Sequence, residues 1–244
     1  MPALRRSLPW GLALLLVTGA GGLAAWAWLG TSVAGIAAWL RSSDKNRGSL
    51  ETLSVYGEVP DFALTERSGR RVTRADLLSK VWIANFIYTQ CKETCPLQSA
   101  KLARLQSEFS GEQDFRLVSI TVDPERDTAA VLSRYAERYA ADAIRWLFLT
   151  GDKRAIYHLA KEGFHLAVVD PDDQARAGGL FALLGPAPAH ATHGSKGLVI
   201  HSSLLVLVDQ QARIRAYHRP DDEPSLERLR QNVRIVLREK PKER

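Results

Sequence analysis

The longest apolar stretch of the chain lies near its N-terminus. Residues 7–40 contain no charged side chain and no histidine. About 20 helical residues cross the hydrocarbon core of a membrane, so residues 8–29 are predicted to form a transmembrane helix. Trp10 near one end and Trp28 near the other suit the two membrane interfaces, where tryptophan is enriched. Residues 1–40 are therefore expected to be an N-terminal membrane anchor.

The charges before this stretch predict its orientation. Arg5 and Arg6 favour a cytoplasmic N-terminus, which places the rest of the chain outside the cytoplasm. We expect a single-pass protein of the inner (cytoplasmic) membrane with a periplasmic C-terminal domain. The sequence "AWA" at residues 25–27 also fits a cleaved signal peptide, but the apolar run continues past it, which favours a retained anchor. Both alternatives export the domain.

Beyond the anchor, apolar runs of strand length alternate with amphipathic segments. The runs at 81–88, 115–122 and 145–150 predict buried strands of a parallel sheet. Helical patterns follow each run, at 95–109, 127–140 and 152–163. Two further strands, 198–209 and 212–218, are predicted to form a hairpin, and a last helix is expected to begin at Pro224.

This order of elements predicts an α/β fold, with a thioredoxin-like mixed sheet flanked by helices. Residues 41–58 are polar and have no helical stripe, so we expect a juxtamembrane linker there and one domain over residues 59–244. Residues 170–197 are rich in glycine, proline and alanine and are interpreted as an insertion or long loop. In this fold the active loop follows the first central strand, which here corresponds to residues 88–96.

The net charge of the chain bears on whether it binds nucleic acid. The formal net charge is +6, and two of the arginines belong to the expected anchor, residues 1–40. The remaining surplus is mild, so we expect no nucleic-acid partner.

The predicted active loop, "YTQCKETCP", holds both cysteines of the chain, Cys91 and Cys95. In an exported domain they should be paired in a disulfide bond, bound to a metal, or cycling between the two. At a helix N-terminus the macrodipole favours thiolates. The C-x-x-x-C spacing is wider than the C-x-x-C redox motif and suits a metal. Two thiolates with one imidazole fit Cu(I) best, whereas Zn(II) would need a fourth ligand.

The third ligand is expected to be a histidine. His201 is the strongest candidate, because it opens the strand segment "SLLVLVD" and can project from the sheet edge toward the active loop. Surface or capping positions are expected for His158, His165 and His218. His190 and His193 lie in the 170–197 segment, where the alternative is that they bind a metal weakly.

Four segments in order resemble the Sco/SenC family of copper-binding assembly factors for cytochrome c oxidase, over residues 56–240. They are "FIYTQCKETCP", "SITVDPERDT", "FLTGDKRAIYHLAKEGF" and "VIHSSLLVLVD". The resemblance implies copper bound by Cys91, Cys95 and His201, as Cu(I) or also Cu(II). It implies a metallochaperone, not an enzyme, that delivers copper to the copper A subunit of the oxidase. An upstream copper donor or thiol reductant would be a second partner.

Two residues depart from the family pattern. Proline commonly follows the first cysteine, whereas this chain has Lys92. Aspartate often precedes the histidine, whereas this chain has Ile200, so another group such as Asp123 would have to orient the ring.

Two other interpretations stay open. The cysteines could serve a thiol-disulfide reductase that keeps the cysteines of the oxidase copper site reduced. They could also form a permanent disulfide in an inert adaptor, but a five-residue loop would stabilise the fold by only about 2 kcal/mol or less.

Overall fold

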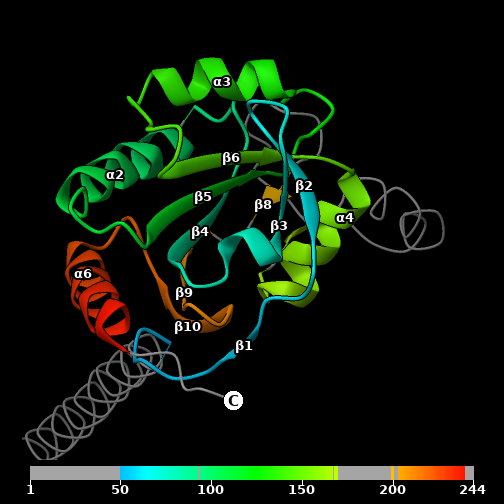
Figure 1. The fold of residues 1–244 in the computed structure, drawn as a ribbon. Helices are drawn as coiled ribbons and strands as arrows, with labels where there is room; N and C mark the ends of the chain where they lie inside the picture. Colours follow the sequence, from blue (N-terminus) through cyan, green and yellow to red (C-terminus); the bar gives the residue numbers. More distant parts are fainter. Residues whose placement is uncertain (1–49, 93, 167, 170–198, 201–202, 240–244) are drawn as a thin grey trace, which may run out of the picture. The chain divides into compact units, whose positions relative to one another are not determined.

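A computed structural model describes residues 50–92, 94–166, 168–169, 199–200 and 203–239 (Figure 1). The predicted membrane helix at 8–29 and all of the predicted insertion at 170–197 lie outside these residues. Among the helices that are described, none is long and apolar enough to cross a membrane. The C-terminal compact unit spans Leu50–Arg244.

An eight-stranded mixed sheet forms the centre of this unit, in the strand order β1-β10-β9-β4-β5-β6-β2-β3 (Figure 1). The three apolar runs form parallel central strands, as predicted: β4 (Val81–Ile87), β5 (Phe115–Thr121) and β6 (Trp146–Thr150). The predicted hairpin corresponds to β9 (Leu205–Val208) and β10 (Arg213–His218), which are antiparallel. Three short strands complete the sheet: β1 (Gly57–Glu58), β2 (Ala63–Glu66) and β3 (Arg71–Thr73).

The strand predicted over residues 198–209 is divided in the structure. Its beginning forms β8 (Val199–Ile200), which pairs with β7 (Val168–Val169) in a separate two-stranded sheet. Its end forms β9, which pairs with β4 and β10. The polar residues 201–203 interrupt the apolar run at this division. His201 therefore precedes β9 by four positions and lies outside the described residues.

Residues 50–58, expected to belong to the linker, contact the domain. The backbone N–H of Tyr217 donates to the carbonyl of Leu50, and that of Tyr56 donates to Ile214. Glu51 is buried, accepts a hydrogen bond from the Ser225 hydroxyl and pairs with an arginine of the last helix. These contacts join residues 50–58 to the compact unit that spans Leu50–Arg244. The sequence pattern also missed β2, β3 and the 3-10 helix η1 (Arg74–Leu77).

Helices cover both faces of the sheet (Figure 1). One face packs against α2 (Thr94–Glu108), α3 (Ala129–Glu137) and α6 (Glu223–Arg238). The other face packs against α4 (Lys153–His158) and the π-helical turn η2 (Leu159–Gly163). Thr128 and Asp152 cap α3 and α4, because their side chains accept backbone N–H groups of the first turn.

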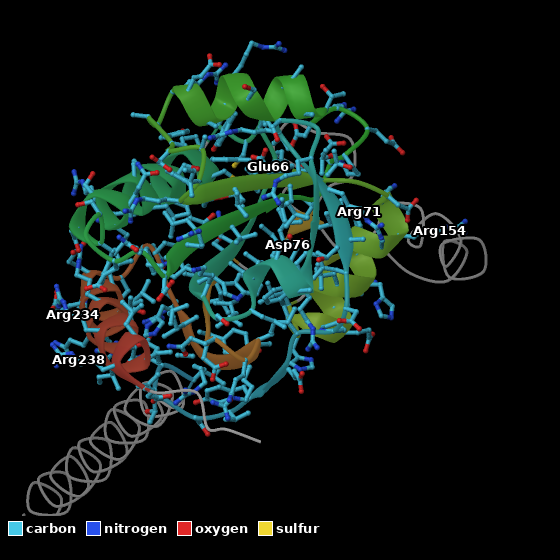
Figure 2. All side chains as sticks on the ribbon, in the orientation of Figure 1. Glu66, Arg71, Asp76, Arg154, Arg234 and Arg238 are labelled. Carbon is cyan, nitrogen blue, oxygen red and sulfur yellow. The ribbon has the colours of Figure 1, made fainter. Side chains whose placement is uncertain are left out.

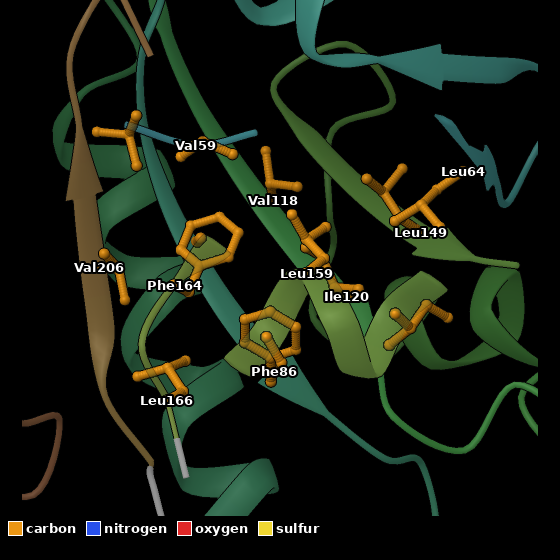
Figure 3. Packing of buried hydrophobic residues seen from close by; sticks show 14 of the residues in the cluster. Val59, Leu64, Phe86, Val118, Ile120, Leu149, Leu159, Phe164, Leu166 and Val206 are labelled. Atoms are coloured by element: carbon orange, nitrogen blue, oxygen red, sulfur yellow. The ribbon is translucent and has the colours of Figure 1, made fainter. Parts of the chain in front are cut away.

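All seven residues of β4 are buried, which explains why six of them are apolar. Alternate side chains enter the two cores: Trp82 and Phe86 lie on the α4 face, and Ile83 and Ile87 lie on the α2 face. Figure 3 shows Phe86 and Phe164 in the first of these cores. Figure 2 shows charged side chains such as Arg234 and Arg238 projecting outward from α6. Asn85 interrupts the apolar series on the α2 face of β4 and is fully buried.

Candidate metal centre

The loop between β4 and α2 carries both cysteines. Cys91 lies before the helix, with its backbone N–H donating to the carbonyl of Tyr88 at 3.2 Å. Cys95 is the second residue of α2. The sequence therefore predicted the position of the pair correctly, with one cysteine in the loop and one at the helix entry.

The helix entry places the backbone of Cys95 against the sulfur of Cys91. The N–H of Cys95 donates to Cys91 Sγ at 3.4 Å, and Thr94 Oγ1 lies 3.6 Å from the same sulfur. Cys91 is half-buried and Cys95 is 5% exposed, and no disulfide joins them. One N–H group of the helix N-terminus, that of Cys95, is thus directed at Cys91, where it favours a negatively charged sulfur.

The Cys95 thiol differs from the expectation that the helix dipole favours its thiolate. A hydrogen bond to Cys91 and burial together raise the pKa of Cys95 far above its ordinary value. In the metal-free protein Cys95 is therefore a protonated thiol, and Cys91 is the sulfur that accepts hydrogen bonds. Binding a metal to both sulfurs must release the Cys95 proton, because only the thiolate is a good ligand.

Asp127 connects the cysteine loop to the loop after β5. Its carboxylate accepts the N–H of Thr89 at 3.0 Å and the hydroxyl of Thr89 at 2.5 Å. The Thr121 hydroxyl donates to the same carboxylate at 2.6 Å. Asp127 is 1% exposed, and this burial raises its pKa. Thr128 is the N-cap of α3, and Asp127 positions the backbone two residues before Cys91.

We expect Asp127→Asn to lower the free energy of unfolding by about 1–3 kcal/mol. The N–H and hydroxyl of Thr89 and the hydroxyl of Thr121 would then face an amide, which has one acceptor oxygen and an NH₂ group in place of two acceptor oxygens. Urea denaturation measures the change. Asp152→Asn is the matched control, since asparagine caps a helix as well as aspartate does and its oxygen can still accept the Ala155 N–H. Equal losses in the two variants would contradict a special role for Asp127.

Asp123, the residue considered for orienting the imidazole, lies in the same loop. It is 7% exposed, and its carboxylate pairs with Arg126 at 3.2 Å. Its backbone carbonyl accepts the N–H groups of Arg126 and Asp127 and turns the chain. These contacts show that Asp123 forms a turn. That Asp123 orients the imidazole of His201 stays a prediction.

Gln98 is a second buried polar residue that the sequence reading missed. It lies one helical turn after Cys95 and is 3% exposed. Its side-chain N–H donates to the carbonyl of Ser203 at 3.0 Å, across 105 residues of sequence. The spacing in the sequence could have indicated it, because a residue three positions after Cys95 on a helix must share its helix face.

The histidines take different positions. His158 and His165 are exposed, as expected. His218 is fully buried at the end of β10, which corrects the expected surface or capping position. Three candidates, His190, His193 and His201, lie outside the described residues. Among the residues that the structure describes, no group of three histidine, cysteine, aspartate or glutamate side chains could hold a metal ion.

Comparisons with known proteins bear on this site. The family model described as SCO1/SenC matches residues 53–237, well over half of the chain. The chain belongs to the SCO1/SenC family. The resemblance inferred from the four sequence segments is thereby confirmed.

Individual members of the SCO1/SenC family show the extent of the similarity. The SCO1 protein homolog of Bacillus subtilis (strain 168) is 35% identical over 133 residues, which are 53% of this chain and 69% of the relative. The mitochondrial SCO2 homolog of Mus musculus is 33% identical over 104 residues, 41% of this chain and 40% of the relative. The chain therefore spans less than half the length of the mouse protein.

Solved SCO1/SenC structures share the fold. A SCO1/SenC family lipoprotein from Bacillus anthracis str. Ames has a TM-score of 0.59 at 25% identity, covering 73% of this chain and 94% of that protein. Yeast Sco1 with copper bound has a TM-score of 0.55 at 23% identity, covering 76% of this chain and 92% of that protein. These likenesses confirm the predicted thioredoxin-like mixed sheet with flanking helices.

Proposed function

We propose that the protein is a membrane-anchored copper metallochaperone that uses Cys91, Cys95 and His201 as ligands. The observation that carries the proposal is the contact between Cys91 Sγ and the backbone of Cys95 at the N-terminus of α2. Membership in the SCO1/SenC family supports it, since solved relatives include Sco1 from yeast with copper bound. The two sulfurs are separate thiols here and are therefore available as ligands.

Copper fits the chemistry of this donor set. Two thiolates with one imidazole form a soft site of low coordination number, which favours Cu(I) and also accepts Cu(II). The Cys95 N–H at the start of α2 favours negative charge on Cys91. Cys95 supplies the second thiolate after losing its proton to solvent.

The third ligand is supported by the position of Ser203. Its carbonyl is 3.0 Å from the Gln98 side chain, one helical turn from Cys95. His201 precedes Ser203 by two residues, and two residues of chain span at most about 7 Å. The pairing of β9 with β4 also supports this ligand. Because the two strands are antiparallel, the segment before Leu205 leads toward the carboxyl end of β4, where the cysteine loop begins.

The acceptor is proposed to be the copper A subunit of a cytochrome c oxidase. A solved relative, BsSco, is described as a member of the Sco family of cytochrome c oxidase assembly proteins. Transfer would proceed by exchange of thiolate ligands and would change no covalent bond of a substrate. Cys91 is more exposed than Cys95, so an incoming thiolate would reach the metal from the Cys91 side. Residues 1–40 would hold the domain at the periplasmic face of the inner membrane, near the oxidase.

Copper analysis after anaerobic loading tests the proposal. The reduced protein is expected to bind about one equivalent of Cu(I), as one site with three ligands predicts. The absence of copper above background would rule out the chaperone function. If the metal-free dithiol then reduced an oxidised acceptor peptide, the reductase alternative would replace it.

His201→Ala should weaken Cu(I) binding, because an imidazole ligand is lost while both sulfurs remain. The Cys91–Cys95 disulfide should still form on oxidation. Competition against a Cu(I) chelator measures the affinity, and thiol counting measures the disulfide. His158→Ala, at an exposed position of α4, is the matched control. An unchanged affinity in the His201 variant would show that another residue is the third ligand.

A further inference from the structure

A chain of hydrogen bonds, buried except at its last link, runs from β6 through β5, β4 and α2 to Ser203. The indole N–H of Trp146 donates to the Ser119 hydroxyl at 2.9 Å, and this hydroxyl donates to Asn85 Oδ1 at 2.7 Å. The Asn85 NH₂ group donates to Gln98 Oε1 at 3.3 Å, and the Gln98 NH₂ group donates to the Ser203 carbonyl at 3.0 Å. The chain thus links β6, β5, β4 and α2 to the segment before β9.

The direction of this chain is determined at both ends. An indole N–H can only donate, and a backbone carbonyl can only accept. Each hydroxyl and amide between them is therefore oriented in one way. Trp146, Ser119 and Asn85 are fully buried and Gln98 is 3% exposed, so water has little access to the first three links. The last link, to the carbonyl of the exposed Ser203, is part-buried. An amide held at both of its ends in this way has little freedom to move.

Gln98 stands between the two parts of the proposed site. It shares a helix face with Cys95, three positions earlier in α2. Its other contact, Ser203, is two residues beyond His201 in the chain. The side chain of Gln98 consequently ties the segment that carries the histidine to the helix that carries the buried sulfur.

We propose that Gln98 is a positioning residue for copper binding, which sets the place of His201 relative to the Cys91–Cys95 pair. The inference rests on the proposed function. Gln98 is not itself proposed as a copper ligand. It fixes the Ser203 backbone, and the rest of the buried chain from Trp146 fixes Gln98. Partners of this kind orient metal ligands and are needed for full affinity.

A double-mutant cycle on the full chain separates this role from a purely structural one. Gln98→Leu should weaken Cu(I) binding by about 10- to 100-fold, measured by chelator competition. In the His201→Ala background the same change should weaken binding by less than about threefold, because the ligand that Gln98 positions is already gone. Equal losses in both backgrounds would overturn the inference, since Gln98 would then act through the sulfurs or through overall stability.

Gln106→Leu is the matched control. Gln106 lies on the same helix and also donates from its side chain to a backbone carbonyl, that of Ala140, at 3.1 Å. It is remote in sequence from both proposed ligand segments, so its loss should leave the copper affinity unchanged. Ser119→Ala is a second test variant, which breaks the chain one link earlier. It should give a smaller loss with the same dependence on His201.

A measurement without copper tests the same contact. In the metal-free protein, Gln98→Leu should speed amide hydrogen exchange at residues 203–205 and leave β10 unchanged. Unchanged exchange at 203–205 would overturn the inference.

The failure of the proposed function can be told apart from the failure of this role for Gln98. A wild-type protein that binds no copper overturns the proposed function and this role together. A wild-type protein that binds copper but shows no coupling between Gln98 and His201 overturns only the role of Gln98.

Discussion

Cys91→Ser is expected to abolish tight Cu(I) binding, the largest effect on function that the structure predicts. Serine is close in size to cysteine, so the loop should keep its shape. Its hydroxyl is a hard, neutral oxygen, which is a poor ligand for Cu(I). The variant lacks the hydrogen bond to Cys91 Sγ, but burial still raises the pKa of the remaining thiol, Cys95, so this single sulfur is a weak ligand alone. Copper retained after gel filtration of the reduced, loaded variant measures the loss.

The control for this variant is Thr94→Val. The Thr94 hydroxyl lies 3.6 Å from Cys91 Sγ, so valine removes a neighbour of the sulfur and leaves the sulfur itself. This variant should retain about one equivalent of copper. Cys95→Ser should lose copper as Cys91→Ser does. Full retention of copper in either serine variant would contradict the two-sulfur site.

The sequence predicted the centre of the fold because buried parallel strands have an unmistakable pattern. The runs that became β4, β5 and β6 are mostly apolar, since both faces of the sheet are covered. The strands β1, β2 and β3 are two to four residues long and partly exposed, so no comparable run marks them. The split between β8 and β9 depends on pairing with different partners, which a local pattern does not contain.

At the site, the sequence could find the cysteines, whose chemistry and local spacing are visible in nine residues. The contacts of Asp127 and Gln98 could not be found in this way. Asp127 reaches Thr89 across 38 residues, and Gln98 reaches Ser203 across 105. Such contacts exist only after the sheet has aligned the ends of its strands. A buried polar residue next to a candidate ligand is nevertheless a usable signal, because it must find a hydrogen-bond partner.

His218 provides the largest expected effect on stability. It is fully buried, and its Nε2 accepts a hydrogen bond from Asn232, whose NH₂ also donates to the carbonyl of Glu51. Burial lowers the pKa of His218 to about 4, partly offset by the Glu51 carboxylate and reinforced by Arg228. Protonated Nε2 would present a second donor to the Asn232 NH₂ group. The folded state therefore requires a neutral imidazole.

The sign of the pH dependence follows from this pKa. The unfolded chain binds the proton at an ordinary pKa of 6.5, whereas the folded protein binds it only near pH 4. Stability from this group is full above pH 6.5 and falls as the pH decreases from 6.5 to 4. The expected total loss is about 3 kcal/mol, because each pKa unit corresponds to about 1.4 kcal/mol. Urea denaturation at several pH values measures it.

His218→Gln should remove this part of the pH dependence, because an amide can still accept from Asn232 but does not titrate. The quantity to compare is the change in unfolding free energy between pH 6.5 and 4 in the variant and in the wild type. The raised pKa of Asp127 contributes to both proteins and cancels in the difference. His158→Gln, at an exposed position, should keep the wild-type dependence. A His218 variant that loses as much stability on acidification as the wild type would show that another group senses the pH.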